Sequence, residues 1–163
     1  AEANLYGANL TRADLTRANL YEATLYEANL AEADLAEANL YGANLTRADL
    51  TRADLYGVKG DFHAILDITP NEVAGLRLAL VEGRVDGSTY EGSCACLVGT
   101  IANVAHVDYT AIPGIEPDAD RPAERWFLAI REGDTPENNP VAAITLGWID
   151  EWLTEQAAKA MPA

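Results

Sequence analysis

Cysteine, histidine and methionine are nearly absent from this sequence. The chain of 163 residues contains 2 Cys, 2 His and 1 Met. Two cysteines cannot build the dense disulfide framework of small secreted domains, so we expect a reduced, cytoplasmic protein. The sequence also lacks an apolar run long enough to cross a bilayer and a basic-then-apolar segment at its start. We therefore predict no membrane anchor and no signal peptide.

Positive charge is scarce as well. The chain has 11 Lys and Arg residues against 26 Asp and Glu residues, which gives a formal net charge of −15. Nucleic acids and anionic membranes repel a protein of this charge, so neither is expected as a direct partner. Glycine-rich phosphate-binding motifs and the Gly-x-Ser-x-Gly nucleophile motif are absent too. These absences predict a protein that is not an enzyme and that needs no cofactor.

What the sequence does contain is a five-residue pattern that occurs eleven times between Ala3 and Gly57. Alanine is first and leucine third in every copy, and the second residue is Asn or Asp in all copies except at Thr24. Five residues of an α-helix turn about 500°, so these leucines would not form a stripe. In a flat strand, an odd period would send successive copies to opposite sides. The pattern therefore predicts a solenoid of short extended segments separated by bends.

Tandem copies of Ala-(Asn/Asp)-Leu-x-x resemble the pentapeptide-repeat proteins, over residues 1 to about 60. The resemblance implies a β-solenoid, namely a right-handed quadrilateral β-helix with four repeats in each coil. Some members of this family mimic DNA and occupy the DNA-binding surface of gyrase. The resemblance thus implies one possible function, an acidic DNA mimic that inhibits a DNA-binding enzyme such as gyrase.

Four repeats per coil would place residues that are twenty positions apart above one another. Arg12, Glu32 and Arg52 then alternate in one column, and Arg17 lies over Glu37. Such pairs are worth about 0.2–1 kcal/mol each and indicate a structural role. Tyrosines are expected to stack in the same way, in the pairs Tyr6 with Tyr26 and Tyr21 with Tyr41.

One column carries like charges, because Asp14, Asp34 and Asp54 are also twenty residues apart. Adjacent coils lie roughly 4.8 Å apart, so this column costs stability unless it has a use. The functional interpretation is a partner-binding acidic strip that mimics phosphates or collects cations. The structural interpretation is that Asp replaces Asn, because either side chain can bond to the backbone of the turn.

The ends of the solenoid need covering. Eleven repeats make fewer than three coils, which amounts to an axial length of only ~13 Å. Leucines in the outermost coils have neighbours on one side only, and repeat arrays need polar caps. No cap precedes Ala3, so we expect either further coils before it or a homodimer through the uncapped N-terminal coil.

The remainder of the chain, residues 60–163, is predicted to be a mainly helical module that caps the last coil, with the repeat domain covering residues 1–59. It resembles small helical modules that follow pentapeptide repeats in some bacterial and phage proteins. Residues 61–68 are apolar but too few to classify. Helices are expected from a capping box at Thr69–Glu72 to Gly83, over 94–105, from Pro122 to Gly133, and from Asn139–Pro140 onward.

The helical module holds the few residues that suggest chemistry. Cys94, Cys96 and His106 could form a ligand or metal cluster, but the Cys-x-Cys spacing and the apolar flanks are more typical of core cysteines. Trp126, Trp148 and Trp152 could line a ligand pocket or a partner groove, but their helical spacing is more typical of core residues. The sequence as a whole predicts a non-enzymatic scaffold for protein interactions. DNA mimicry, or a small-ligand or enzymatic function in the helical module, are the alternatives.

Overall fold

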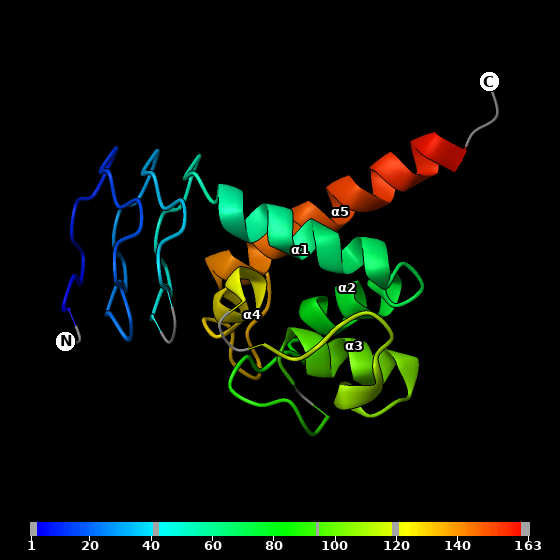
Figure 1. Cartoon of the computed structure of the whole chain (residues 1–163). Coiled ribbons are helices and arrows are strands. Elements are labelled where there is room, and N and C mark those ends of the chain that lie inside the picture. The colour runs from blue at the N-terminus through cyan, green and yellow to red at the C-terminus, as the bar shows by residue number, and fades with distance from the viewer. Residues whose placement is uncertain (1–2, 41–42, 94, 119–120, 161–163) are drawn as a thin grey trace.

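Stacked coils at the N-terminal end continue directly into a group of helices (Figure 1). The computed structural model describes residues 3–40, 43–93, 95–118 and 121–160. Parallel bridges join residues that are twenty positions apart, as in the row Asn4, Thr24 and Asn44. Four repeats therefore complete one coil, and the N-terminal part is a β-solenoid of short bridges in place of long strands.

Backbone hydrogen bonds between coils follow a fixed rule. From Thr24 onward, the second residue of each repeat bonds with both its N–H and its C=O to the preceding coil. Asp34 N–H, for example, donates to Ala13 C=O at 2.9 Å, and Asp34 C=O accepts from Leu15 N–H at 2.8 Å. The leucine N–H and the alanine C=O of each repeat point the other way, towards the following coil. Every coil therefore has two chemically different edges.

The corners explain why the second residue is Asn or Asp. Asn9 Oδ1 accepts the N–H of Thr11 at 3.1 Å, and Asp49 Oδ1 accepts the N–H of Thr51 at 2.9 Å. This Asx-type bond holds the turn, whose next residue has a positive φ, such as 59° at Arg12. The left-handed conformation is unfavourable for residues with a Cβ, so the corner needs such a local bond.

The leucines and alanines of the repeats fill the interior. Leu25, Leu30, Leu35 and Leu45 in the inner coils are almost fully buried. Leu5, Leu10 and Leu15 in the first coil are only partly buried. The first coil is therefore open on its outer side in this structure, whereas the last coil is covered by the helices.

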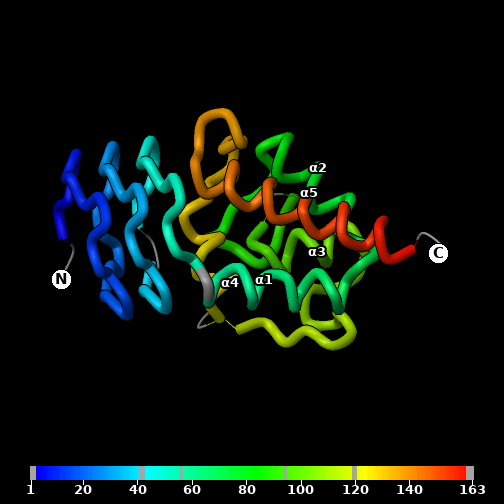
Figure 2. The backbone as a smooth tube through the Cα atoms, turned by 90° about the horizontal axis from the view of Figure 1, so that it is seen from above, coloured from blue at the N-terminus to red at the C-terminus, as the bar shows by residue number. Residues whose placement is uncertain are grey.

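The helical part consists of five α-helices and one short 3-10 helix in the described residues. α1 (Tyr56–Ile68) and α5 (Pro140–Ala160) run side by side away from the last coil (Figures 1 and 2). The other elements are α2 (Val73–Val81), α3 (Leu97–Ala105), η1 (Tyr109–Ala111) and α4 (Pro122–Phe127). α4 packs against α1, and α2 packs against both α3 and α5.

Helix α1 differs from the prediction, because it begins at Tyr56, inside the eleventh repeat and before the expected boundary at residue 60. Val58, Phe62, Ile65 and Leu66 share its buried face. This is the i, i+4, i+7, i+8 spacing of an amphipathic helix. Residues 61–68 are therefore helical, and no linker separates the solenoid from the helices.

The predicted capping box at Thr69–Glu72 is wrong. Thr69 ends α1, where its hydroxyl donates to Ile65 C=O at 2.9 Å, and α2 begins only at Val73 without a side-chain cap. The hydroxyl bonds backwards because α1 occupies the residues before it. The helix at 122–133 is also shorter than predicted, ending at Phe127. The cap at Asn139 is confirmed, since Asn139 Oδ1 accepts the N–H of Val141 at 2.8 Å.

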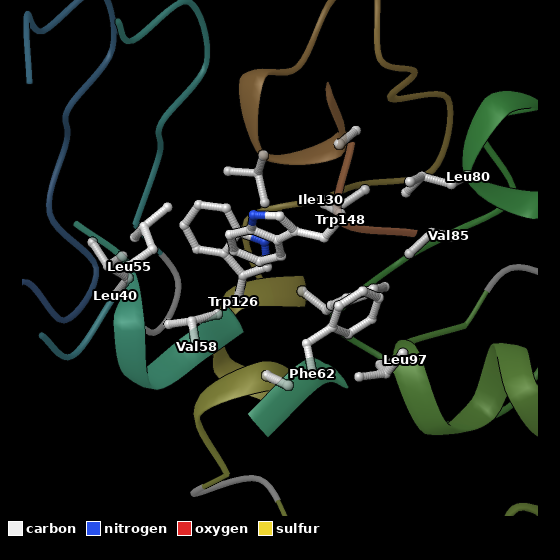
Figure 3. Packing of buried hydrophobic residues seen from close by; sticks show 14 of the residues in the cluster. Leu40, Leu55, Val58, Phe62, Leu80, Val85, Leu97, Trp126, Ile130 and Trp148 are labelled. Carbon is white, nitrogen blue, oxygen red and sulfur yellow. The ribbon is translucent and has the colours of Figure 1, made fainter. Parts of the chain in front are cut away.

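The two parts share one hydrophobic core. Leu40 and Leu55 of the coils contact the core beside Val58, and Trp126 and Trp148 lie next to them (Figure 3). The two indole rings are 5.5 Å apart between centroids. Trp126, Trp148 and Trp152 are all buried, which confirms them as core residues. The solenoid interior and the helical core are therefore continuous.

Candidate functional site

The aspartate column lies where the sequence placed it. Parallel bridges join Asp14 to Asp34 and Asp34 to Asp54. Asp14 and Asp54 are exposed and Asp34 is half-buried. Asp14 Oδ1 accepts the N–H of Thr16 at 3.0 Å, and Asp34 Oδ1 accepts the N–H of Ala36 at 2.9 Å. Asp14 and Asp34 therefore make the bond to the turn that the structural interpretation predicts.

Hydrogen bonding keeps the first carboxylate ionised. The hydroxyl and the backbone N–H of Thr16 lower the pKa of Asp14 below its ordinary value. Asp14 is therefore negatively charged at neutral pH, even though a second aspartate lies in the next coil.

Charge ladders border the column on both sides. Arg12 Nε lies 2.7 Å from Glu32 Oε2, and Arg52 lies 3.7 Å from Glu32 Oε1. On the other side, Arg17 Nε lies 2.7 Å from Glu37 Oε2, which lowers the pKa of Glu37. The face is therefore a line of carboxylates between mixed-charge ladders and is not a continuous negative surface.

The aspartate column ends at a cavity between the last coil and α5. This cavity has a volume of about 440 Å³. The solenoid contributes Leu50, Arg52, Ala53, Asp54 and Leu55, while α1 contributes Lys59 and α5 contributes Ile144 and Trp148. The volume lies in the range of small-ligand and side-chain pockets, ~300–1,000 Å³. Neither part of the chain forms this cavity alone.

The walls of the cavity are apolar and its rim is charged. Trp148 is 9% exposed and is held from behind by Phe62, with ring centroids 6.1 Å apart. At the rim, Lys59 Nζ lies 2.7 Å from Glu151 Oε2, and its ammonium group lowers the pKa of that carboxyl. Arg52 is 80% exposed and only loosely paired. Its guanidinium group is therefore available to an acidic partner.

Of the predicted cluster of Cys94, Cys96 and His106, the two described residues do not lie together. Cys96 lies at the N-terminal end of α3 and His106 at its C-terminal end, and Cys94 is outside the described residues. Nine helical residues separate the two, a distance of about 14 Å. Burial also raises the pKa of the Cys96 thiol to about 11, so it is a neutral core residue.

In the described residues, no group of three or more His, Cys, Asp or Glu side chains is placed to hold a metal ion. Within the same residues, no helix combines the length and the apolar character that a membrane span requires.

Sequence reasoning missed the cavity residues Arg52, Lys59 and Ile144. The sequence pattern predicts only a ladder for Arg52, whereas a pocket is its second interpretation for Trp148. One signal was available, because the repeat pattern breaks at Lys59 while the column of aspartates reaches Asp54. That break marks the end of the solenoid, but it cannot show which helix covers it.

The repeated corners, the twenty-residue bridges and the leucine interior define a repeat solenoid. The family model for pentapeptide repeats matches residues 1–35 and 28–59, with 8 copies. Residues 1–59 are therefore a pentapeptide-repeat segment, as the sequence resemblance indicated.

Among solved structures, the chain is similar to HetL, a pentapeptide repeat protein involved in heterocyst differentiation regulation from the cyanobacterium Nostoc sp. strain PCC 7120. The two share 42% identity over 34% of this chain and 29% of HetL, with a TM-score of 0.24. The chain thus spans under a third of HetL. A comparison with curated proteins gave no match.

Proposed function

We propose that the protein is a non-enzymatic scaffold that binds a partner protein on the face formed by the aspartate column and the junction cavity. One observation carries the proposal. Asp14, Asp34 and Asp54 lie in register, and Asp54 is also part of the cavity wall that α5 completes. A partner that contacts the column therefore reaches the helical part as well.

The chemistry of the face favours a basic partner segment. The chain carries a formal net charge of −15, which attracts cationic surfaces and speeds their association. Regular spacing of the carboxylates supplies the specificity, because a partner must present cations at the same interval. An apolar side chain of the partner would enter the cavity beside Trp148 and supply affinity.

A charge-only variant tests this proposal. Asn already occupies the second position in most repeats, where it makes the same bond to the turn. Asp14→Asn, Asp34→Asn and Asp54→Asn together should therefore keep the fold and remove the charges. Affinity capture, identification of the partner, and titration of the purified pair should show at least about tenfold weaker binding for the triple variant.

The control removes the same charge elsewhere. Asp49→Asn lies in a different column, and Glu116→Gln and Glu155→Gln lie on exposed parts of the helical region. This matched variant should bind the partner like the wild type at moderate salt. Equal binding by all three proteins would show that the aspartate column is not the recognition surface.

DNA mimicry is a weaker proposal for the same face. The acidic column supports it, but Arg12, Arg52 and Arg17 lie within the ladders that border the column. The coils, fewer than three, also extend over only ~13 Å, well under one duplex turn of ~34 Å. Gyrase supercoiling that is unaffected by micromolar protein would rule this function out.

A homodimer through the first coil also remains a proposal. Leu5, Leu10 and Leu15 are only partly buried there, so a second copy could cover them. Light scattering coupled to size exclusion should then give twice the chain mass, and Leu10→Glu should restore the monomer. A monomer at all concentrations would refute it.

A further inference from the structure

The last coil of the solenoid has an unpaired backbone edge. By the rule that relates successive coils, the N–H of Leu50, Arg52 and Leu55 and the C=O of Ala53 point away from the preceding coil. One coil earlier, the equivalent Leu30 N–H donates to Asp49 C=O at 2.8 Å, and Leu35 N–H donates to Asp54 C=O at 3.0 Å. In the described residues, these four groups of the last coil have no hydrogen-bond partner.

The helices cannot supply those partners. α1 and α5 cover the leucine side chains, but the main-chain groups along the side of a helix are already bonded within the helix. A helical cap therefore closes the solenoid interior without pairing its edge. The unpaired edge borders a cavity, because Leu50, Arg52, Ala53 and Leu55 all line the cavity of about 440 Å³.

Two smaller cavities lie along the same edge. One of about 250 Å³ is lined by Ala43, Asn44 and Thr46 together with Leu128 and Ala129. Another of about 240 Å³ is lined by Ala38 and Leu40 together with residues of α1 and α4. The cavity at residues 50–55 is the largest of the three and combines four unpaired backbone groups with an apolar wall.

We propose that this edge binds an extended peptide segment of a partner protein, which adds to the solenoid as a short strand of the next coil. Binding by strand addition needs free main-chain groups and a pocket for an inward side chain, and both are present here. The inference rests on the proposed scaffold function and deepens it at the junction cavity, where it assigns a role to the backbone edge in addition to the charged side chains.

The register of the solenoid specifies the peptide. A residue that exchanges two hydrogen bonds with Ala53 C=O and Leu55 N–H takes the place that Asp54 holds relative to Ala33 and Leu35. The next residue then points into the cavity, towards Ile144 and Trp148, and should be Leu or of similar size. The residue two positions earlier lies beside Arg52.

Charge alternation along the column predicts which type of residue the peptide should carry beside Arg52. Arg12, Glu32 and Arg52 alternate along one column, so an acidic residue continues the ladder. Arg52 can accept it, because its guanidinium group is 80% exposed and lies 3.7 Å from Glu32. The preferred peptide therefore consists of an acidic residue, a small residue, a polar residue and a leucine, in that order.

The probe is an acetylated and amidated peptide with the sequence of residues 31–36, Ala-Glu-Ala-Asp-Leu-Ala. Titration of the full chain labelled with ¹⁵N should shift the amide signals of Leu50, Arg52 and Leu55. N-methylation of the peptide's Asp amide removes the bond to Ala53 C=O and should weaken binding about tenfold. N-methylation of its Leu amide, which points away from the coil, should have little effect. Equal effects of the two methyl groups would overturn the proposal.

Protein variants test the side-chain part of the proposal. Arg52→Glu should weaken binding about tenfold, and a peptide with Lys in place of Glu should restore it. Arg12→Glu is the matched control, because Arg12 is similarly exposed, at 75%, in the same column but lies in the first coil. Ile144→Glu should abolish binding by placing a charge in the cavity wall.

Two outcomes would replace the proposal. Absence of any shift at residues 50–55 at millimolar peptide would show that the edge does not bind strands. Dimers that Ile144→Glu dissociates would show that a second copy of this chain occupies the edge. The aspartate triple variant distinguishes failure here from failure of the scaffold function, because it removes the charges of the column and leaves the backbone edge and Ile144 unchanged.

Discussion

Leu→Ala substitutions in one column of leucines measure how well each end of the solenoid is covered. Leu10, Leu30 and Leu50 occupy the same position in three successive coils, so a Leu→Ala change removes the same atoms from the same type of turn. Leu30 is 0% exposed and Leu50 is 6% exposed, whereas Leu10 is only partly buried. The three substitutions therefore differ only in what surrounds the leucine.

The expected losses follow from that burial. Leu→Ala in a packed core costs about 2–5 kcal/mol, so Leu30→Ala and Leu50→Ala should each lose about 3 kcal/mol. Leu10→Ala should lose about 1–2 kcal/mol, because part of its side chain is already in contact with water. For a chain of this size, 3 kcal/mol lowers the melting temperature by roughly 6–12 °C.

Urea unfolding followed by circular dichroism measures these differences in the free energy of unfolding. The comparison holds when m, the dependence of that free energy on urea concentration, is the same for all variants. If Leu50→Ala costs no more than Leu10→Ala, the helices do not cover the last coil and the continuous core is refuted. If Leu10→Ala costs as much as Leu30→Ala, the first coil is covered in solution, as the homodimer proposal requires.

Two further predictions concern α4. Burial raises the pKa of Glu124, which also accepts the N–H of Asp118 at 3.0 Å. The protonated form is thus favoured in the folded state, so its stabilising contribution is present at acidic pH and is lost as the pH rises through the raised pKa. Glu124→Gln should gain stability relative to the wild type as the pH is raised above the ordinary glutamate pKa of about 4.3 in parallel urea titrations, and a constant difference would contradict this. Asp61 Oδ1 pairs with Arg121 at 2.8 Å and Asp61 Oδ2 accepts the N–H of Ala123 at 2.9 Å. Asp61→Ala should therefore lose about 2–4 kcal/mol, with a smaller loss for Asp61→Asn, and equal stability of both variants would refute this role.

The repeat segment could be predicted from the sequence because one period determines its geometry. Four repeats per coil fix which residues are neighbours, so the Arg12, Glu32 and Arg52 ladder and the aspartate column were placed correctly. Tyr6 and Tyr26 stack as expected, with ring centroids 5.6 Å apart. The predicted pair of Tyr21 with Tyr41 lies outside the described residues, since Tyr41 is not among them.

The junction could not be predicted, because two patterns overlap there. Residues 56 and 57 continue the five-residue repeat pattern, yet Val58 and Phe62 already follow helical spacing. The helix prevails because its apolar face is buried against α4 and α5. Tertiary packing, which the sequence pattern does not contain, also decides that Ile144 and Trp148 border the last coil and leave its edge unpaired.

Amide hydrogen exchange, resolved by residue with NMR, tests the unpaired edge most directly. The amides of Leu30, Glu32 and Leu35 donate to the next coil at 2.8–3.0 Å, and those of Leu50, Arg52 and Leu55 are their counterparts one coil later. The structure predicts strong protection for the first set, fast exchange for the second set, and protection of the second set when the peptide is added. Equal protection of both sets in the free protein would show that the edge is already paired, and would contradict the account.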